Sequence, residues 1–229
     1  TCRKHFFIPM QEVLDAPKRR RVTTTAPRKS APRKTAPRRD VPPALIYEQW
    51  NGKPVYYRGY EDVLAGKKTI EEVASSSDLQ GVLVSILHGY LFGTIDRKKY
   101  LLATNEPGLH LALNDNLGND LAIFEKERVG KLKGKYFEVP PRVVIEVDIK
   151  ADLSDFTNKE SDYIFQKSQK MLDFGVEKVV WVLTSSRKTY LIDRHDPRWY
   201  VVNWNEDIPL LDGCVVNIER LLAEEGVEY

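Results

Sequence analysis

The segment from residue 140 to residue 150 constrains the fold most, because it has the pattern of a strand and yet carries charges at alternate positions. It reads Pro-Pro-Arg-Val-Val-Ile-Glu-Val-Asp-Ile-Lys. Two prolines start it sharply and β-branched residues dominate it, which favours a buried strand. One face would carry Val143, Ile145, Val147 and Ile149, and the other Val144, Glu146, Asp148 and Lys150. Because buried carboxylates are costly unless they are paired or bind a cation, Glu146 and Asp148 are the first candidates for a metal site.

A mixed pattern of strands and helices runs from Ala44 to the end of the chain. Asn51-Gly52 predicts a hairpin turn, Pro54 an edge strand, and Gly175 the end of a helix. The expected strands are 45–50, 55–58, 100–103, 109–113, 120–125, 142–150, 179–183, 189–192 and 200–204. The expected helices are 60–65, 69–74, 79–94, 159–174 and 217–224. Residues 44–229 are therefore expected to form an α/β (α+β) domain, with a central mixed β-sheet flanked by helices.

The first 43 residues differ from the rest in charge. They hold 12 Lys+Arg against 3 Asp+Glu, whereas the remainder holds 23 against 30. Three consecutive five-residue units, each with Ala-Pro-Arg at its centre, occupy residues 25–39. Regular prolines and the near absence of apolar side chains predict that residues 1–43 are a disordered basic tail.

This tail is a candidate nucleic-acid contact. Its basic clusters could bind phosphates, and the one at 16–22 also has the composition of a nuclear-import signal. A solvated linker without a specific partner is an equally good interpretation. The candidate nucleic-acid-binding residues are Arg19, Arg20, Arg21, Arg28, Lys29, Arg33, Lys34, Arg38 and Arg39.

Two further residues complete a candidate site with Glu146. Asp120 stands at the entrance of the expected strand 120–125. Lys167 lies at helical spacing within the apolar stripe of Ile164 and Met171, where an ammonium needs a carboxylate partner. Two carboxylates on neighbouring strands can hold a hard cation such as Mg²⁺, and a nearby ammonium can stabilise charge in a phosphodiester hydrolysis. By spacing alone, a structural ion pair with Lys167 is the better interpretation.

A resemblance favours the chemical interpretation. Asn119-Asp-Leu-Ala-Ile-Phe, Val139-Pro-Pro-Arg-Val-Val-Ile-Glu-Val and Lys167-x-x-x-Met-x-x-x-Gly-Val-Glu-Lys-Val-Val-Trp stand in this order. Together they resemble the Uma-two-type family of restriction endonuclease-like proteins, within the PD-(D/E)XK nuclease superfamily. The similarity covers roughly residues 45–204 and implies a restriction-endonuclease-like core.

The resemblance implies roles for individual residues. Asp120 and Glu146 match the metal-binding acids, and the Val147 carbonyl could be a further ligand. The superfamily lysine normally stands where this chain has Asp148, so the resemblance implies that Lys167 supplies the ammonium. Asp148 could add a third oxygen ligand.

Two positions are weaker candidates. Lys150 is a rival for the lysine role, although a solvated charge at the strand end is the favoured interpretation. Gln80 stands where many relatives have a histidine, and this departure puts the activity in question.

The function that these features predict is a metal-dependent endonuclease acting on DNA, with Mg²⁺ or Mn²⁺ as the cofactor and no small-molecule cofactor. The alternative is a catalytically inactive nuclease-fold protein that binds DNA or serves as a scaffold. A homodimer is compatible with either.

The sequence also indicates a compartment. Cys2 and Cys214 are too few and too far apart for a disulfide framework, and the first residues lack the short apolar core of a signal peptide. No run of about 18 apolar residues is present, so no membrane partner is expected. We expect a cytoplasmic protein with nucleoid association as an option, and Met10 is a candidate start of the natural chain.

Overall fold

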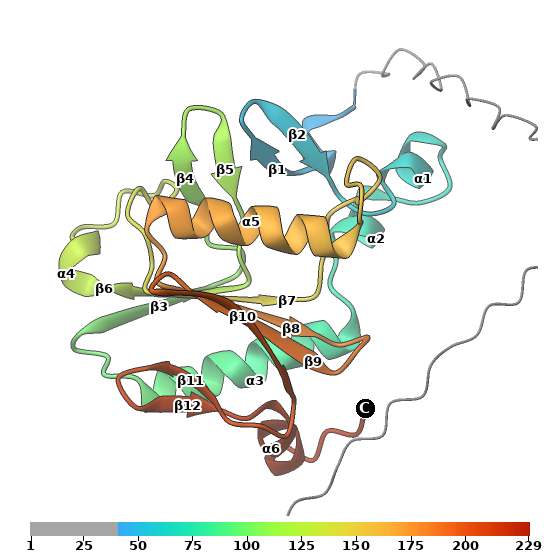
Figure 1. The fold of residues 1–229 in the computed structure, drawn as a ribbon. Helices are drawn as coiled ribbons and strands as arrows, with labels where there is room; N and C mark the ends of the chain where they lie inside the picture. Colours follow the sequence, from blue (N-terminus) through green and yellow to red (C-terminus); the bar gives the residue numbers. More distant parts are fainter. Residues whose placement is uncertain (1–40) are drawn as a thin grey trace, which may run out of the picture. The chain divides into compact units, whose positions relative to one another are not determined.

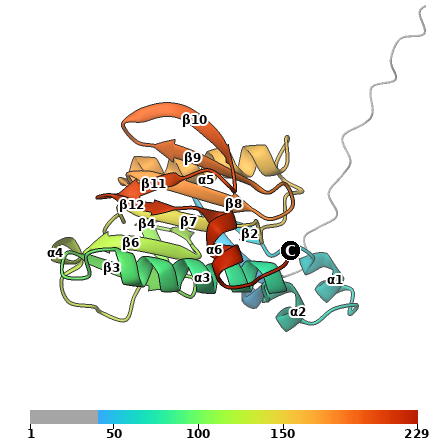
Figure 2. The same cartoon turned by 90° about the horizontal axis from the view of Figure 1, so that it is seen from below.

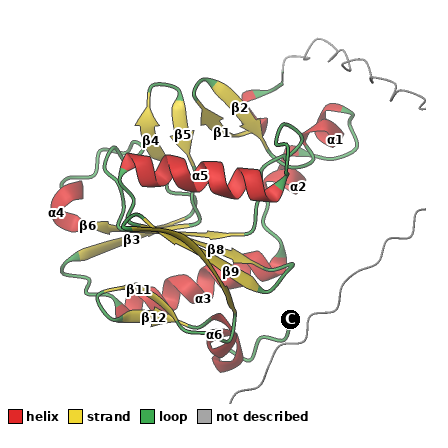
Figure 3. Cartoon of the chain, in the orientation of Figure 1, coloured by secondary structure: helices red, strands yellow, loops and turns green. Residues whose placement is uncertain are grey.

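The computed structural model describes residues 41–229, which form a mixed α+β domain (Figures 1 and 3). Its strands are β1 (Ile46–Trp50), β2 (Lys53–Tyr56), β3 (Tyr100–Thr104), β4 (Leu109–Ala112), β5 (Asp115–Leu117), β6 (Leu121–Glu125), β7 (Val143–Val147), β8 (Lys178–Leu183), β9 (Lys188–Asp193), β10 (Asp196–Asn203), β11 (Ile208–Leu211) and β12 (Cys214–Val216). Its helices are a 3₁₀ turn η1 (Pro43–Leu45), α1 (Tyr60–Leu64), α2 (Ile70–Ala74), α3 (Asp78–Thr94), α4 (Lys126–Val129), α5 (Glu160–Phe174) and α6 (Ile218–Glu224). The predicted fold class is confirmed.

A six-stranded mixed sheet lies at the centre, in the order β10-β9-β8-β7-β6-β3. Only β7 and β8 pair in parallel, and α5 connects them along the chain. The other neighbours in this sheet pair antiparallel. A crossover helix is the usual way to join parallel neighbours, because the chain must return to the starting edge of the sheet before the second strand begins, and a tight turn cannot do this.

Helices cover both faces of this sheet (Figures 1 and 2). Leu83, Leu87 and Leu91 of α3 are buried against one face. On the other face, α5 lies between the central sheet and a four-stranded sheet of order β2-β1-β5-β4. A polar side chain of α5 can therefore meet residues of two sheets at once.

Alternation along β7 sorts its side chains as predicted, up to Val147. Val143, Ile145 and Val147 join the core around α3, whereas Val144 joins the core around α5. The prediction for Ile149 is wrong, because this residue joins the α5 core instead. The strand ends at Val147, and Asp148 has a positive φ of 60°, which breaks the period of two.

Most expected elements are present, and the exceptions are short. The hairpin at Asn51-Gly52 is confirmed, and β2 with its Pro54 is an edge strand. β5 lies where no strand was predicted, because its sequence Asp-Asn-Leu has no apolar alternation. The predictions also lacked α4 and the β11–β12 hairpin.

No helix within residues 41–229 is both long and apolar enough to cross a membrane. The predictions for the basic tail concern residues outside the described part of the chain, apart from Val41 to Pro43. Pro43 begins η1, which packs Leu45 into the interior.

Candidate active site

The ammonium of Lys167 is the centre of a buried polar cluster. Lys167 lies on α5, and its side chain is 0% exposed. Its Nζ atom lies 2.7 Å from Glu48 Oε1 and 3.0 Å from Glu146 Oε1, and it donates to the Gly118 carbonyl at 2.8 Å. The prediction that Lys167 has a carboxylate partner is confirmed, and there are two partners instead of one.

Glu48 of β1 is the residue that sequence reasoning missed. Its Oε2 atom accepts hydrogen bonds from Trp50 Nε1 at 2.9 Å and from the Tyr163 hydroxyl at 3.0 Å. Its Oε1 atom accepts one from the Gly118 backbone N–H at 3.3 Å, besides the ion pair with Lys167. A signal was available, because Glu48 shares a strand face with the buried Trp50 at a spacing of two.

Asp120 lies at the entrance of β6, immediately before Leu121. Since Leu121 pairs with Ile145 on β7, Asp120 lies beside the end of β7. Its Oδ2 atom accepts a hydrogen bond from the Val147 N–H at 2.7 Å. Gln80 of α3 donates from Nε2 to the Val147 carbonyl at 2.6 Å. The last peptide groups of β7 are thus held from two sides, and Gln80 joins the cluster through this bond.

Burial sets the protonation of the cluster. It raises the pKa of Glu146 to about 8, although the Lys167 charge opposes the rise. Burial also raises the pKa of Asp120, against the Val147 N–H bond that favours the charged form. Burial alone would lower the pKa of Lys167, but Glu146 and Glu48 outweigh it and hold this pKa well above its usual value. This pattern is that of carboxylates withdrawn from water beside a single ammonium.

The side-chain hydrogen bonds of Asp148 hold its carboxylate outside the cluster. Its carboxylate accepts hydrogen bonds from the Thr184 N–H at 2.8 Å and the Thr184 hydroxyl at 2.6 Å. These bonds tie the end of β7 to the end of β8 and use both carboxylate oxygens. The carboxylate of Asp148 is therefore engaged away from the cluster, and its role as a third metal ligand stays a prediction.

Lys150 is neither a solvated charge nor a partner of Glu146. Its side chain is only 11% exposed, and its Nζ atom lies 2.7 Å from Glu106 Oε1. Its charge favours the ionised form of Asp120. Lys150 therefore stands at the margin of the cluster, and the favoured interpretation of a solvated strand end is wrong.

The cluster has features that fit a divalent cation. Asp120, Glu146 and Glu48 bring three carboxylates against the one ammonium of Lys167. Glu146 Oε1 is buried and, apart from the Lys167 ion pair, has no hydrogen-bond donor among the described residues. Residues 41–229 hold no group of three His, Cys, Asp or Glu side chains arranged around one metal position. The fit is with a cation that takes few protein ligands and keeps water, as Mg²⁺ does.

The nine basic residues predicted to bind nucleic acid all lie outside the described part of the chain. Among the predicted catalytic and metal-site residues, the structure brings four together in the cluster. They are Asp120, Glu146, Lys167 and Gln80.

Comparison with known proteins supports the fold. No family model matches the sequence, and no curated protein matches it. Among solved structures, a protein of Anabaena variabilis described as "a putative nuclease belonging to DUF820" is similar, with a TM-score of 0.57 and 10% sequence identity. The similarity covers 77% of this chain and 89% of that one. The described domain therefore shares the fold of that DUF820 protein.

Proposed function

We propose that this chain is a metal-dependent endonuclease that hydrolyses DNA phosphodiester bonds, with Asp120 and Glu146 as the metal-binding carboxylates. The observation that carries the proposal is the Lys167–Glu146 ion pair of 3.0 Å beside the strand-entrance carboxylate of Asp120. A buried acidic site that excludes water strengthens electrostatic interactions with a reacting phosphate. The similarity in fold to a protein described as a nuclease supports the same conclusion.

Each residue of the cluster has a distinct task in this proposal. The Val147 N–H fixes the orientation of Asp120, and Lys167 fixes Glu146. Glu48 neutralises part of the Lys167 charge and holds it in place from β1. Lys167 also places positive charge close to the carboxylates where phosphate charge would develop. A bound Mg²⁺ or Mn²⁺ would polarise the phosphorus and lower the pKa of an attacking water.

The alternative function, a nuclease-fold protein that binds DNA without cutting it, rests on a specific observation. The Val147 carbonyl, a candidate metal ligand, accepts a hydrogen bond from Gln80 at 2.6 Å. Lys167 is 0% exposed and already engaged by two carboxylates and a carbonyl. A site closed in this way would bind a cation only after these contacts rearranged.

Cleavage of supercoiled plasmid separates the two functions. The purified chain is incubated with plasmid in Mg²⁺ or Mn²⁺, beside the Asp120→Ala, Glu146→Gln and Lys167→Ala variants. Glu224→Gln removes an exposed carboxylate on α6 and is the matched control. We expect nicking by the wild type and the control and a loss of at least about 100-fold in the three site variants, since each removes a group that acts in the transition state.

Two outcomes would contradict this proposal. Cleavage that survives all three substitutions would show that the assigned cluster is not the active site. A wild type that binds plasmid and leaves it intact with either metal would favour the non-cleaving alternative. Circular dichroism of each variant separates loss of activity from loss of folding.

A further inference from the structure

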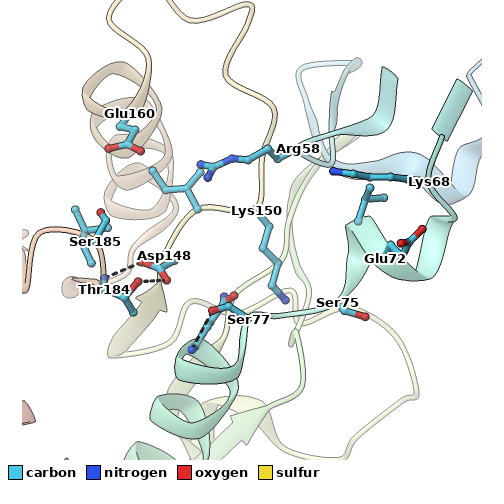
Figure 4. Close-up of a pocket in the computed structure, with 14 residues that line it drawn as sticks. Arg58, Lys68, Glu72, Ser75, Ser77, Asp148, Lys150, Glu160, Thr184 and Ser185 are labelled. Carbon is cyan, nitrogen blue, oxygen red and sulfur yellow. Dashed lines mark hydrogen bonds between the residues drawn. The ribbon is translucent and has the colours of Figure 1, made fainter. Parts of the chain in front are cut away.

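A cleft of about 320 Å³ opens next to the buried cluster. It shares Gln80 with the cluster and continues along the chain just beyond β7, where Asp148, Ile149 and Lys150 line it. Figure 4 shows side chains from several elements entering it, including Arg58 and Lys68. This cleft is thus the hollow adjoining the strand end that Asp120 and Gln80 hold.

Three cations line this cleft, from three separate parts of the chain. Arg58 follows β2, Lys68 precedes α2, and Lys150 follows β7. The Arg58 backbone N–H donates to the Lys150 carbonyl at 2.7 Å, which places these two residues side by side. The Lys68 ammonium lies close to Gly59, the neighbour of Arg58. Residues far apart in sequence therefore bring their positive charges to one place.

These cations are only partly neutralised. Arg58 is exposed and has no ion pair among the described residues. Lys68 is paired with Asp62 at 3.6 Å, and both side chains are more than 40% exposed, so the pair is weak. Lys150 has the closest partner, Glu106 at 2.7 Å, and that carboxylate is 44% exposed. Arg58 and Lys68 can therefore turn to an incoming anion, whereas Lys150 would first have to leave Glu106.

Three carboxylates also line the cleft, and each has a partner or a favourable position of its own. They belong to Glu72, Asp148 and Glu160. Glu72 accepts a hydrogen bond from the Thr69 N–H at 2.6 Å in the capping box of α2. Asp148 is bonded to Thr184 through both oxygens. Glu160 lies in the first turn of α5, where the helix dipole favours a negative charge. These carboxylates balance the three cations in formal charge, but hydrogen bonds hold Glu72 and Asp148 in place, so a phosphate would meet the cations that turn toward it.

We infer that this cleft binds a backbone phosphate of the nucleic acid. Arg58, Lys68 and Lys150 would hold this phosphate beside the buried carboxylates. The inference rests on the proposed function for the identity of the anion. The guanidinium of Arg58 can form bidentate hydrogen bonds with a phosphate, and the two lysines add positive charge. Lys150 would exchange Glu106 for the phosphate and so contact the substrate directly at the margin of the site.

Binding of a labelled duplex tests this inference without depending on cleavage. The full chain is titrated against a fluorescein-labelled 16-base-pair DNA duplex in Ca²⁺, at several salt concentrations. We expect Arg58→Gln and Lys150→Gln each to weaken binding by about five- to ten-fold and to reduce the slope of log Kd against log salt by about one. Arg58→Lys and Lys150→Arg keep the charge and should keep most of the slope.

The matched control is Lys98→Gln. Lys98 is exposed and lies beyond the opposite end of α3 from the cleft. Its loss should change the affinity by less than about two-fold, since it lies roughly 25 Å away at 1.5 Å per helical residue. Cleft variants that match this control would overturn the inference. The double variant Arg58→Gln/Lys68→Gln removes exposed charges only, so it tests the cleft even if Lys150→Gln is unstable.

The failure of this inference is distinguishable from failure of the proposed function. If the wild type cleaves plasmid and the cleft variants bind the duplex normally, only the cleft assignment fails. If the wild type does not cleave but the cleft variants lose affinity and have a smaller slope of log Kd against log salt, the phosphate-binding cleft is supported and the proposed catalytic activity is contradicted.

Discussion

A lysine with 0% exposure remains charged in this protein because the oxygens of two acidic side chains and a carbonyl surround its ammonium. Lys167 has carboxylates on two sides and a carbonyl on a third. The ring centroids of Tyr47 and Trp181 each lie 5.5 Å from its Nζ atom, and such rings attract a cation through their faces. Removing one partner of such a pair leaves an uncompensated buried charge, which is costlier than the pair itself is stabilising.

Glu48 is expected to be critical for folding stability. Glu48→Ala removes one partner of Lys167 and the acceptor for Trp50 and Tyr163. We expect a loss of about 3–5 kcal/mol in the free energy of unfolding, measured by urea denaturation. Glu48→Gln should lose less because it keeps an acceptor, and Glu224→Ala should change stability by less than about 0.5 kcal/mol. Equal stability of Glu48→Ala and the wild type would show that the ion pair with Glu48 is not formed.

The protonation of Glu146 predicts how stability depends on pH in the metal-free protein. Its ordinary pKa is 4.5 and its folded pKa is about 8. Between these values the folded state holds a proton that the unfolded chain has released. Stability should therefore fall as pH rises through this window, by at most about 1.4 kcal/mol per pH unit for this one group. The raised pKa of Asp120 acts in the same direction.

Thermal unfolding in EDTA, from pH 5 to pH 8, checks this dependence. Glu146→Gln cannot titrate, so its stability should decline less steeply with pH than that of the wild type. Saturating Mg²⁺ should also flatten the wild-type decline, because a bound cation favours the ionised carboxylate. Parallel profiles for the wild type and Glu146→Gln in EDTA would contradict the raised pKa.

Three of the four side chains at the centre of the cluster could be predicted from the sequence. Asp120, Glu146 and Lys167 were predictable because each is a charge within an apolar pattern, and their order resembles a known family. The burial of Glu48 had a signal in its strand face, but its contact with Lys167 did not, because β1 belongs to a different sheet and only the packing of that sheet over α5 brings Glu48 to Lys167. Gln80 was named for its position along the chain, but its bond to the Val147 carbonyl depends on where α3 crosses β7.

At the level of elements, the end of β7 determines which charges reach the site. The ladder of β7 with β8 stops at Val147, and Asp148 then adopts a positive φ of 60°. An extended strand through residue 150 would have placed Asp148 on the same face as Glu146. The single left-handed residue turns the carboxylate toward Thr184 instead.

Asp148 is therefore expected to act in folding and not in metal binding. Asp148→Asn keeps an acceptor for the Thr184 N–H, and asparagine tolerates a positive φ. We expect it to change the free energy of unfolding by less than about 1 kcal/mol and to leave Mn²⁺ affinity unchanged by calorimetry. Asp148→Ala loses both bonds and strains the backbone, so it should cost about 1–3 kcal/mol. A large loss of Mn²⁺ affinity in Asp148→Asn would restore it as a ligand.

The long elements were predictable from periodicity, and the short ones were not. α3 and α5 have clear N-terminal or C-terminal signals, such as Ser77 and Gly175, and were predicted to within one residue. β5, β11 and β12 have three or four residues each, too few for a period to appear. The end of β7 was missed because Ile149 continues the apolar alternation on paper, while the break lies in a backbone angle.

Over the whole molecule, opposite charges are divided between the two ends of the sequence. Residues 1–40 contain all 12 basic and 3 acidic residues of the first 43, and residues 41–229 contain 23 and 30. A net acidic domain repels DNA over most of its surface, except where cations gather as they do around Arg58 and Lys150. The positive charge of the basic segment would offset this repulsion.

Deleting residues 1–40 should therefore weaken DNA binding and leave the chemistry intact. The deletion keeps η1, which begins at Pro43. We expect the affinity for the labelled duplex to fall more than about ten-fold near 0.1 M salt, with a shallower salt dependence, because fewer counterions are released. Replacing the Lys and Arg of this segment by Gln at constant length should have the same effect. Hydrolysis of bis(4-nitrophenyl) phosphate, a small substrate without a polyanionic backbone, should be unchanged. An unchanged duplex affinity would mean that the segment has another partner and that the cleft cations alone overcome the acidity of the domain.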